Sequence, residues 1–307
     1  MTKNKIIEVK SVAAFHKLKG LPSPQHPLIS IIDYSHIIQN NENLETVNWV
    51  FDFYQISLKR GMVGKYKYGQ QQYDYDDGVM FFIAPNQVFG IQPTQNHIAK
   101  RTGWMLLIHP DFLLHTTLAN VIKKYEYFNY TVNEALFLSN KEESILKDII
   151  KNIEQECNEN IDKFSQNIII SQIETLLNYS ERFYQRQFIT RKITNHQILD
   201  KLEKLLSDYF ENTNLIENGL PTVQDIAKSL NLSPNYLGSL LKVLTGQNTQ
   251  QHIHKKLIEK AKEKLYNTEL TVSEIAYELG FEHSQSFSKL FKTKTNFSPL
   301  EFRQSFN

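Results

Sequence analysis

The sequence predicts an α+β protein with an N-terminal antiparallel β-barrel or sandwich, a helical connector and an all-helical C-terminal domain. A chain of 307 residues is too long for one ordinary core, which favours two domains. Strand-forming segments fill the first third, helical periodicity begins near Asp111, and two segments near the end resemble each other. We therefore expect domains over residues 1–185 and 196–307, joined by the polar segment 186–195.

The first third contains short segments rich in aromatic and β-branched residues, which favour strands. Turn-forming residues separate them, and the Asp77-Gly78 pair predicts a hairpin. Strands of this length and spacing are typical of an antiparallel barrel or sandwich. The expected strands are Trp49–Leu58, Met62–Tyr68, Gln70–Tyr75, Val79–Ile83, Gln87–Ile91 and Trp104–Ile108.

Four tyrosines alternate at even spacing within two of these segments, so each pair points to one face of its strand. They are candidates for lining an effector pocket, and the alternative is that they belong to the core or the surface of the barrel. These residues are Tyr66, Tyr68, Tyr73 and Tyr75.

The middle of the chain has apolar residues at three- and four-residue spacing, with no proline or glycine between Asp111 and Gly219. This pattern predicts at least two long amphipathic helices. Their apolar face either forms the interface of a homodimer or packs on the barrel of its own chain.

Two segments of the C-terminal region, 222–246 and 271–296, match each other at an offset of 49 residues that becomes 50 after a turn. Each has two apolar-periodic helices joined by a short turn, which is the pattern of a helix-turn-helix unit. The matching pairs are Val223/Val272, Ile226/Ile275, Ala227/Ala276, Leu230/Leu279, Leu237/Phe287, Leu240/Leu290, Leu241/Phe291 and Lys242/Lys292.

Local signals mark the helix ends in both segments. Thr222 and Thr271 are N-caps, each followed three residues later by an acid. Asn231 and Gly280 stand where the turn requires a left-handed backbone. Ser233 and the proline after it begin the second helix of the first segment. One such pattern is weak evidence of function, whereas two copies joined by a basic helix are strong evidence.

The C-terminal region resembles the AraC-type transcriptional regulators over Ile198–Phe306, most densely over Thr271–Arg303. The residues that carry the resemblance are Gly280-Phe281, Phe287, Phe291-Lys292, Ser298-Pro299 and Phe302-Arg303. The resemblance implies a double helix-turn-helix domain with a linker helix, and an N-terminal cupin-like barrel with dimerisation helices. It implies double-stranded DNA and RNA polymerase as partners, and a small-molecule effector for the barrel.

Charge supports this interpretation, because positive residues are concentrated although the net charge is only +1. Seven lysines face two glutamates between Lys228 and Lys264, and three lysines and an arginine face one glutamate after Ser284. Segregated positive charge favours contact with phosphates. The alternative for Lys255–Lys264 is an ordinary solvated helix face.

The outward positions of the second recognition helix, which begins near Ser284, include glutamine and lysine, whose side chains can contact adenine and guanine edges. The matching positions of the first helix include Gly238 and a short serine, which departs from the family's pattern. Either Asn235 and Tyr236 contact bases there, or that helix contributes shape and phosphate contacts. Leu257 in the linker helix is a further departure. The candidate DNA-binding residues are Ser233, Asn235, Tyr236, Ser239, Lys242, Ser284, Gln285, Ser288, Lys289 and Lys292.

Other classes of function are disfavoured. The single cysteine, Cys157, excludes a disulfide framework and a cysteine zinc cluster, and the histidines show no metal-ligand spacing in the β-region. No catalytic motif appears, so we expect no enzyme activity and no cofactor. Apolar runs are too short for a membrane span, and no targeting segment is visible, which favours the cytoplasm. The remaining alternatives are a regulator whose barrel only dimerises and a barrel enzyme with an appended helical domain.

Overall fold

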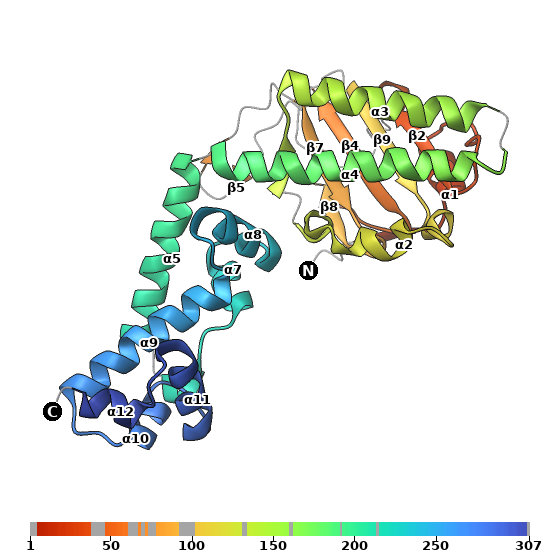
Figure 1. Ribbon diagram of the computed structural model, residues 1–307. Coiled ribbons are helices and arrows are strands. Elements are labelled where there is room, and N and C mark those ends of the chain that lie inside the picture. The colour runs from red at the N-terminus through yellow and green to blue at the C-terminus, as the bar shows by residue number, and fades with distance from the viewer. Residues whose placement is uncertain are drawn as a thin grey trace. The chain divides into compact units, whose positions relative to one another are not determined.

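The protein divides into two compact units, Met1–Gln187 and Phe188–Asn307 (Figure 1). The computed structural model describes residues 5–37, 47–60, 67–68, 71–72, 78–91, 102–130, 134–159, 162–190, 192–212 and 215–305. The polar segment 186–195 is helical on both sides of residue 191, because α4 spans Ser165–Thr190 and α5 spans Lys192–Asn212. None of the helices in these described ranges combines the length and apolarity that a bilayer span requires.

The first unit is built on a five-stranded antiparallel sheet of order β10-β7-β4-β9-β2. A three-stranded sheet of order β1-β3-β8 lies beside it, with β1 parallel to β3. The strands are β1 Lys5–Val9, β2 Ile29–Asp33, β3 Val47–Phe51, β4 Tyr54–Arg60, β7 Val79–Ile83, β8 Phe89–Ile91, β9 Thr102–Ile108 and β10 Leu136–Phe137, and a separate pair consists of β5 Lys67–Tyr68 and β6 Gln71–Gln72.

The expected closed barrel is not present in the described strands, since β10 and β2 are the two edges of an open sheet. The physical reason lies in the segment interpreted as one strand, Trp49–Leu58. It bends at Asp52 and Phe53, so its first part pairs in the small sheet and its second part pairs in the large one. The Asp52 amide bonds the Val9 carbonyl at 3.2 Å, and the Phe53 side chain is fully buried. The bend therefore joins two sheets.

An apolar cluster packs α1 (Val12–Leu18) and the small sheet against one face of the large sheet. At its centre the rings of Phe51 and Phe53 stack at 5.0 Å, and Phe15 of α1 meets both edge-on. These three side chains are at most 2% exposed. The turn region between β9 and β10 holds α2 (Leu118–Val121) and the short 3-10 turns Pro110–Leu113, Ile122–Lys124 and Glu126–Asn129; another such turn, Tyr34–His36, follows β2.

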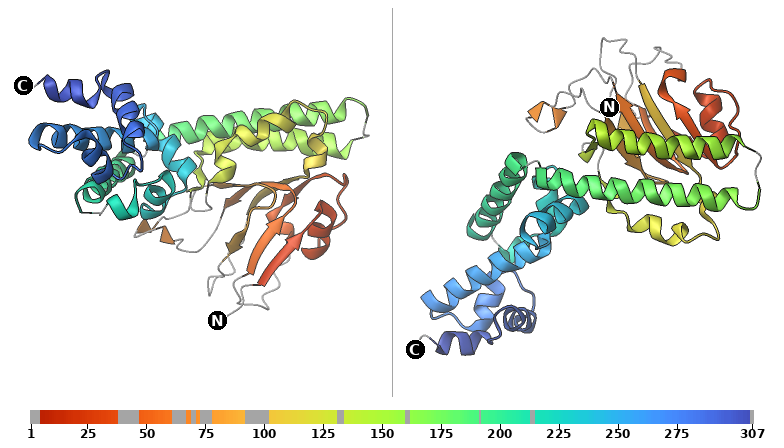
Figure 2. Two further views of the ribbon diagram at one scale, coloured as in Figure 1. Left: turned by 90° about the horizontal axis from the view of Figure 1, so that it is seen from below. Right: turned by 45° about the horizontal axis from the view of Figure 1, so that its top comes forward.

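Two long helices cover the other face of the large sheet, α3 (Asn140–Asn158) and α4 (Figure 2). Their apolar positions are buried within this one chain, including Leu146, Ile153, Ile173 and Leu177, none of which is exposed. The helices thus match the predicted periodicity. Most of their apolar face packs on the sheet of the same chain, although Ile168 remains 45% exposed.

The C-terminal end of α4 is tied to the sheet by polar contacts. The Arg186 guanidinium donates to both carboxylate oxygens of Glu142 at 2.9 and 2.8 Å and to the Phe137 carbonyl at 2.7 Å. The buried Gln187 amide accepts from the Phe137 amide at 2.9 Å and donates to the Ala135 carbonyl at 3.2 Å. Its side chain therefore bonds the backbone on both sides of Leu136, the first residue of β10.

The second unit is all-helical in the residues described. After α5 and α6 (Leu215–Asn218) it contains α7 (Val223–Ser229), α8 (Pro234–Thr245), α9 (Thr249–Asn267), α10 (Val272–Glu278), α11 (Ser284–Thr295) and α12 (Pro299–Gln304). Helix α9 packs against α5, α8, α10 and α12, so it is the centre of the unit. Its inward residues Ile253, Leu257, Ala261 and Leu265 are at most 1% exposed.

Candidate nucleic-acid interface

The first helix-turn-helix unit is formed by α7 and α8, and hydrogen bonds fix both helix starts. The Thr222 hydroxyl accepts from the Asp225 amide at 3.2 Å, and the Asp225 carboxylate accepts from the Thr222 amide at 3.0 Å. After α7, Asn231 adopts φ 56°. The Ser233 hydroxyl then accepts from the Tyr236 amide at 3.2 Å and begins α8. The predicted caps and turn of this unit are confirmed.

The second helix-turn-helix unit, formed by α10 and α11, has the same local structure up to its turn. The Glu274 amide donates to the Thr271 hydroxyl at 3.2 Å, and the Thr271 amide donates to the Glu274 carboxylate at 2.7 Å. Gly280 adopts φ 82° in the turn. Helix α11 begins at Ser284 as predicted, but His283 makes no side-chain capping bond. The first amides of α11 therefore lack the side-chain acceptor that α8 has.

Each second helix presents one apolar face and one polar face. In α8, Leu237, Leu240 and Leu241 are unexposed, and in α11 Phe287 and Phe291 are unexposed. The opposite faces carry the predicted contact residues: Asn235, Lys242, Gln285, Lys289 and Lys292 are exposed, and Ser239, Ser284 and Ser288 are half-buried. Both units thus hold a polar helix face outward on a fully packed core.

A helix-turn-helix family model matches residues 226–305. The C-terminal domain of the two-component response regulator yesN from Fusobacterium nucleatum is 31% identical; this chain covers 96% of that structure, which matches 33% of this chain with a TM-score of 0.27. The C-terminal domain of AraT, a response regulator from Geobacillus stearothermophilus, is 30% identical, and the match covers 84% of that structure and 35% of this chain with a TM-score of 0.31.

Curated relatives match segments of the chain of similar length. The activator RhaS of Escherichia coli is 37% identical over 79 residues, which cover 26% of this chain and 28% of RhaS. An uncharacterised HTH-type transcriptional regulator of Pseudoalteromonas carrageenovora is 30% identical over 116 residues, which cover 38% of this chain and 64% of the relative. The match thus spans less than two thirds of either relative.

The C-terminal region of the chain carries a helix-turn-helix domain of the AraC type. These relatives and the matched domain are regulators rather than enzymes. The match lies in the C-terminal region, and the cupin-like character expected for the N-terminal unit is not part of it.

Two of the predicted contact residues of this AraC-type domain have other partners. The Tyr236 ring is 8% exposed and meets the ring of Phe188 edge-on at 5.1 Å, so it lies in the core of the unit. Ser233 is 6% exposed, and its hydroxyl caps α8. Of the two side chains considered for base contact on α8, only Asn235 is exposed.

The lysines differ in whether they are paired. Lys260 bonds Glu263 at 2.8 Å, and Lys264 bonds Glu278 of α10 at 2.6 Å. Part of the basic linker helix is therefore neutralised within the domain. Among the described residues, Lys242 of α8 and the two outward lysines of α11, Lys289 and Lys292, form no ion pair and are exposed. Exposed lysines without an ion pair thus lie on both recognition helices, and also on α9 at Lys255 and Lys262.

Leu257 and Arg303 show how the linker helix α9 is held. Leu257, the departure from the family's pattern, is unexposed in the core of the domain. Arg303 of α12 donates from Nε to the Leu265 carbonyl at 3.1 Å, near the C-terminus of α9. Sequence reasoning treated Arg303 only as a charge and a family hallmark. The capping box of Ser298 that starts α12 was the signal that could have placed Arg303 there.

The two histidines of α9, His252 and His254, have hydrogen-bond partners within the domain. His252 bonds the Thr245 hydroxyl and His254 bonds the Gln250 amide, each at 2.9 Å. Burial lowers the pKa of both rings. No cluster of histidine, cysteine or acidic residues suited to a metal occurs in the part of the chain that is described. Burial and nearby glutamates raise the pKa of the Cys157 thiol to about 11, which makes it a poor nucleophile.

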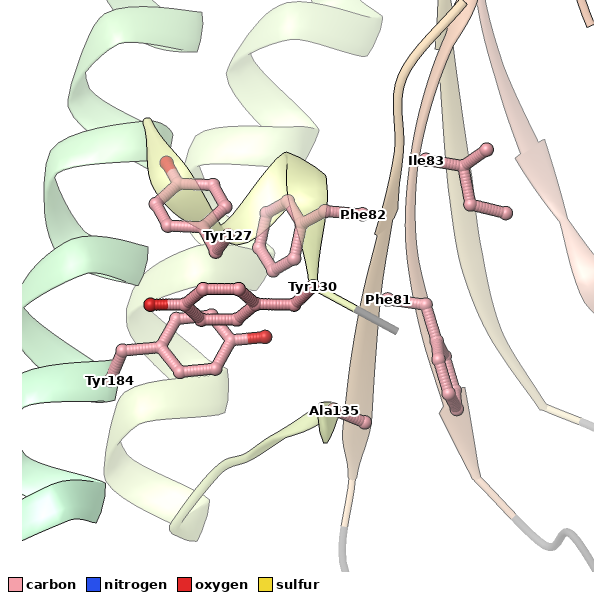
Figure 3. A pocket seen from close by; sticks show the side chains of 7 residues that line it. All are labelled: Phe81, Phe82, Ile83, Tyr127, Tyr130, Ala135 and Tyr184. Carbon is pink, nitrogen blue, oxygen red and sulfur yellow. The ribbon is translucent and has the colours of Figure 1, made fainter. Parts of the chain in front are cut away.

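The predicted effector tyrosines cannot be placed. Tyr66, Tyr73 and Tyr75 lie outside the described residues, and Tyr68 belongs to β5, whose side chains are not described. A different aromatic group lies between the large sheet and α4 (Figure 3). Its side chains are Phe82, Tyr127, Tyr130 and Tyr184, while Phe81 and Ile83 point to the other side of β7.

Hydrogen bonds hold this aromatic group in place. The Tyr127 hydroxyl donates to the Leu177 carbonyl at 2.9 Å, and the Tyr184 hydroxyl donates to the Glu134 carbonyl at 3.1 Å. The rings of Tyr127 and Tyr184 stack at 5.5 Å. The cavity they border is about 10 Å³, room for about one water molecule. In this conformation the group is a packed core rather than an open effector pocket.

Proposed function

We propose that the protein is a sequence-specific DNA-binding transcriptional regulator whose recognition helices α8 and α11 enter successive major-groove faces of double-stranded DNA. Such helices are about one helical turn of DNA, ~34 Å, apart when they act on one duplex. The observation that carries the proposal is the pair of outward polar faces, each with exposed and unpaired lysine, on two helix-turn-helix units of an AraC-type domain.

The side chains divide into two roles. Gln285 and Lys289 of α11 are long, exposed and able to bond base edges, so they supply direct recognition. Lys242 and Lys292 supply phosphate contacts, which fix the register of the domain on the duplex. The N-terminus of α11 near Ser284, which has no side-chain cap, would add backbone contacts to phosphate.

The N-terminal unit is proposed as the sensory half, over residues 1–185. It would respond to a small-molecule effector through a cupin-like fold, and the regulator would act with RNA polymerase in the cytoplasm. The alternative is a unit that only forms a homodimer. The exposed apolar residues Phe164 and Ile168 near the start of α4 support this alternative, because a second copy of the chain would bury them. A thermal-shift screen with small metabolites separates the two: stabilisation by one metabolite supports sensing, and none together with a dimer in solution supports the alternative.

The test of DNA binding is its dependence on salt. Each neutralised phosphate adds roughly 0.9 to the slope of the log–log plot of affinity against salt concentration. The variant with both Lys242→Ala and Lys292→Ala should lower that slope by roughly 1.8 on every duplex, whereas Lys260→Ala, at a lysine paired within the domain, should leave it nearly unchanged. A wild-type slope near zero would contradict the proposed function.

A further inference from the structure

Gly238 lies in the middle of α8, where glycine is an unfavourable residue. Helix α8 spans Pro234–Thr245, so this position is far from both caps. Glycine in a helix interior lowers the folding equilibrium constant roughly twofold to fivefold relative to alanine. A glycine at such a position calls for a physical reason.

The described residues of the protein supply no such reason. A Cβ atom built on Gly238 would meet no described atom within 4 Å, and its φ is not in the left-handed region. Other glycines of the chain differ. A Cβ on Gly103 would lie 2.1 Å from the Leu58 carbonyl oxygen, and one on Gly280 would lie 2.9 Å from the Leu215 carbonyl oxygen. The fold requires those two glycines, but it does not require Gly238.

Gly238 lies on the outward face of α8. It is three residues after Asn235 and four before Lys242, so the three positions share one side of the helix. Both neighbours are exposed. At the offset of 50 the matching residue of α11 is Ser288, which is also small and lies between the longer Gln285 and Lys292. Both recognition helices therefore have a short residue at the centre of the face that points away from the core.

We propose that Gly238 allows the backbone of α8 to approach the DNA duplex more closely than any residue with a Cβ atom would permit. The inference rests on the proposed function. Glycine is the residue that allows a helix backbone to come nearest to a ligand. In this arrangement α8 binds by close fit and by the phosphate contact of Lys242, and the missing side chain is part of the interface.

A competing explanation is that Gly238 is an unused reading position, at which a longer side chain would simply add a base contact. Two variants separate the explanations. Gly238→Ala adds one methyl group, and Gly238→Gln adds a side chain able to bond an adenine edge. Ser229→Ala is the control, because Ser229 is an exposed residue of α7 whose hydroxyl bonds the Asp225 carbonyl within its own helix.

Affinities are measured with the full chain, at one fixed salt concentration, on a duplex that the wild-type protein selects from a randomised pool. Unfolding is followed in parallel by urea titration of the helical signal. We expect Gly238→Ala to unfold at an equal or higher urea concentration, since alanine favours the helix. It should nonetheless bind the duplex roughly tenfold more weakly, because the methyl group meets a close-packed partner.

The Gly238→Gln variant should bind no better than Gly238→Ala, and Ser229→Ala should bind within about twofold of wild type. Weaker binding with undiminished stability cannot come from misfolding. Wild-type affinity of Gly238→Ala, or tighter binding by Gly238→Gln, would overturn the close-approach inference and leave the proposed function intact. Failure of the wild-type protein to select any duplex would instead overturn the proposed function, and the inference with it.

Discussion

The two helix-turn-helix units share their frame and differ in what surrounds it. Both begin with a threonine capping box, and both turn through a residue with positive φ, Asn231 in one and Gly280 in the other. The surroundings of those two residues are unlike. Gly280 lies against the backbone of Leu215 and Gly219, which follow α5, whereas the Asn231 side chain is exposed. Equal backbone geometry therefore does not mean equal tolerance to substitution.

The recognition helices differ in the same way. Helix α8 has a serine cap, a buried tyrosine, and glycine and serine at the centre of its outward face. Helix α11 has no side-chain cap, and its outward face includes the longer side chains of glutamine and lysine. With the proposed function, this difference predicts a division of labour: α11 would supply base contacts, and α8 would supply close fit and phosphate contacts. Repeats of one motif in one chain are thus free to diverge on the face that does not pack.

The largest effect should come from the turn. Gly280→Val places a β-branched residue at φ 82° and against the Leu215 carbonyl, which should destabilise the C-terminal domain by roughly 3 kcal/mol. Gly280→Asn introduces a residue that accepts a left-handed backbone, but its Cβ atom would still contact the Leu215 carbonyl. It should lower the free energy of unfolding by roughly 1–3 kcal/mol. The matched change Asn231→Gly should stay within about 0.5 kcal/mol.

Urea unfolding of the three variants measures this order. Equal losses for Gly280→Asn and Asn231→Gly would mean that the contact of Gly280 with Leu215 and Gly219 has no energetic weight.

The next effect concerns DNA recognition. Gln285→Ala and Lys289→Ala should each weaken binding by about 1–3 kcal/mol and relax the preference at one or two base pairs. Ser239→Ala on α8 should change affinity and preference little, and Lys242→Ala should weaken all sequences alike. Selection from randomised DNA with each variant is the measurement. The division of labour fails if the most constrained bases lie under α8, and Asn235 would then be the residue to test.

The smallest effect is a pH dependence that both units should share. Hydrogen bonds from the cap residue lower the pKa of Asp225, chiefly through the Thr222 hydroxyl, and of Glu274, chiefly through the Thr271 amide. A lowered folded-state pKa means that the stabilisation is present above the ordinary pKa and is lost as the pH falls through the lowered one. The N-termini of α7 and α10 should therefore fray together below about pH 4.

Amide hydrogen exchange between pH 6 and pH 3 follows the first turn of each helix. Asp225→Asn should remove the pH dependence for α7 alone, with α10 as the internal control. Protection of both helices that is unchanged down to pH 3 would show that the carboxylates add nothing to the caps.

The helix ends and turns of the C-terminal domain were predictable from the sequence because they depend on local chemistry. A threonine cap with an acid three residues later, a residue that accepts positive φ, and a proline at the first helical position act within one or two turns of chain. The apolar spacing of α3 and α4 was predictable for the same reason. The repeat at an offset of 49 and 50 residues then indicated two copies of one unit, and the family resemblance followed from it.

Only the tertiary structure showed which residues distant in the sequence contact one another. The segment Trp49–Leu58 has the pattern of one strand, but its two parts join different sheets, because pairing partners distant in sequence set strand boundaries. From its position in the sequence Tyr236 was a candidate for base contact, but in the structure its ring packs against Phe188. Lys264 contributes to the positive charge of the linker helix in the sequence, but in the structure it forms an ion pair with Glu278. Gly280 and Gly238 are both glycines, and only the atoms around them show that the fold requires the first and not the second.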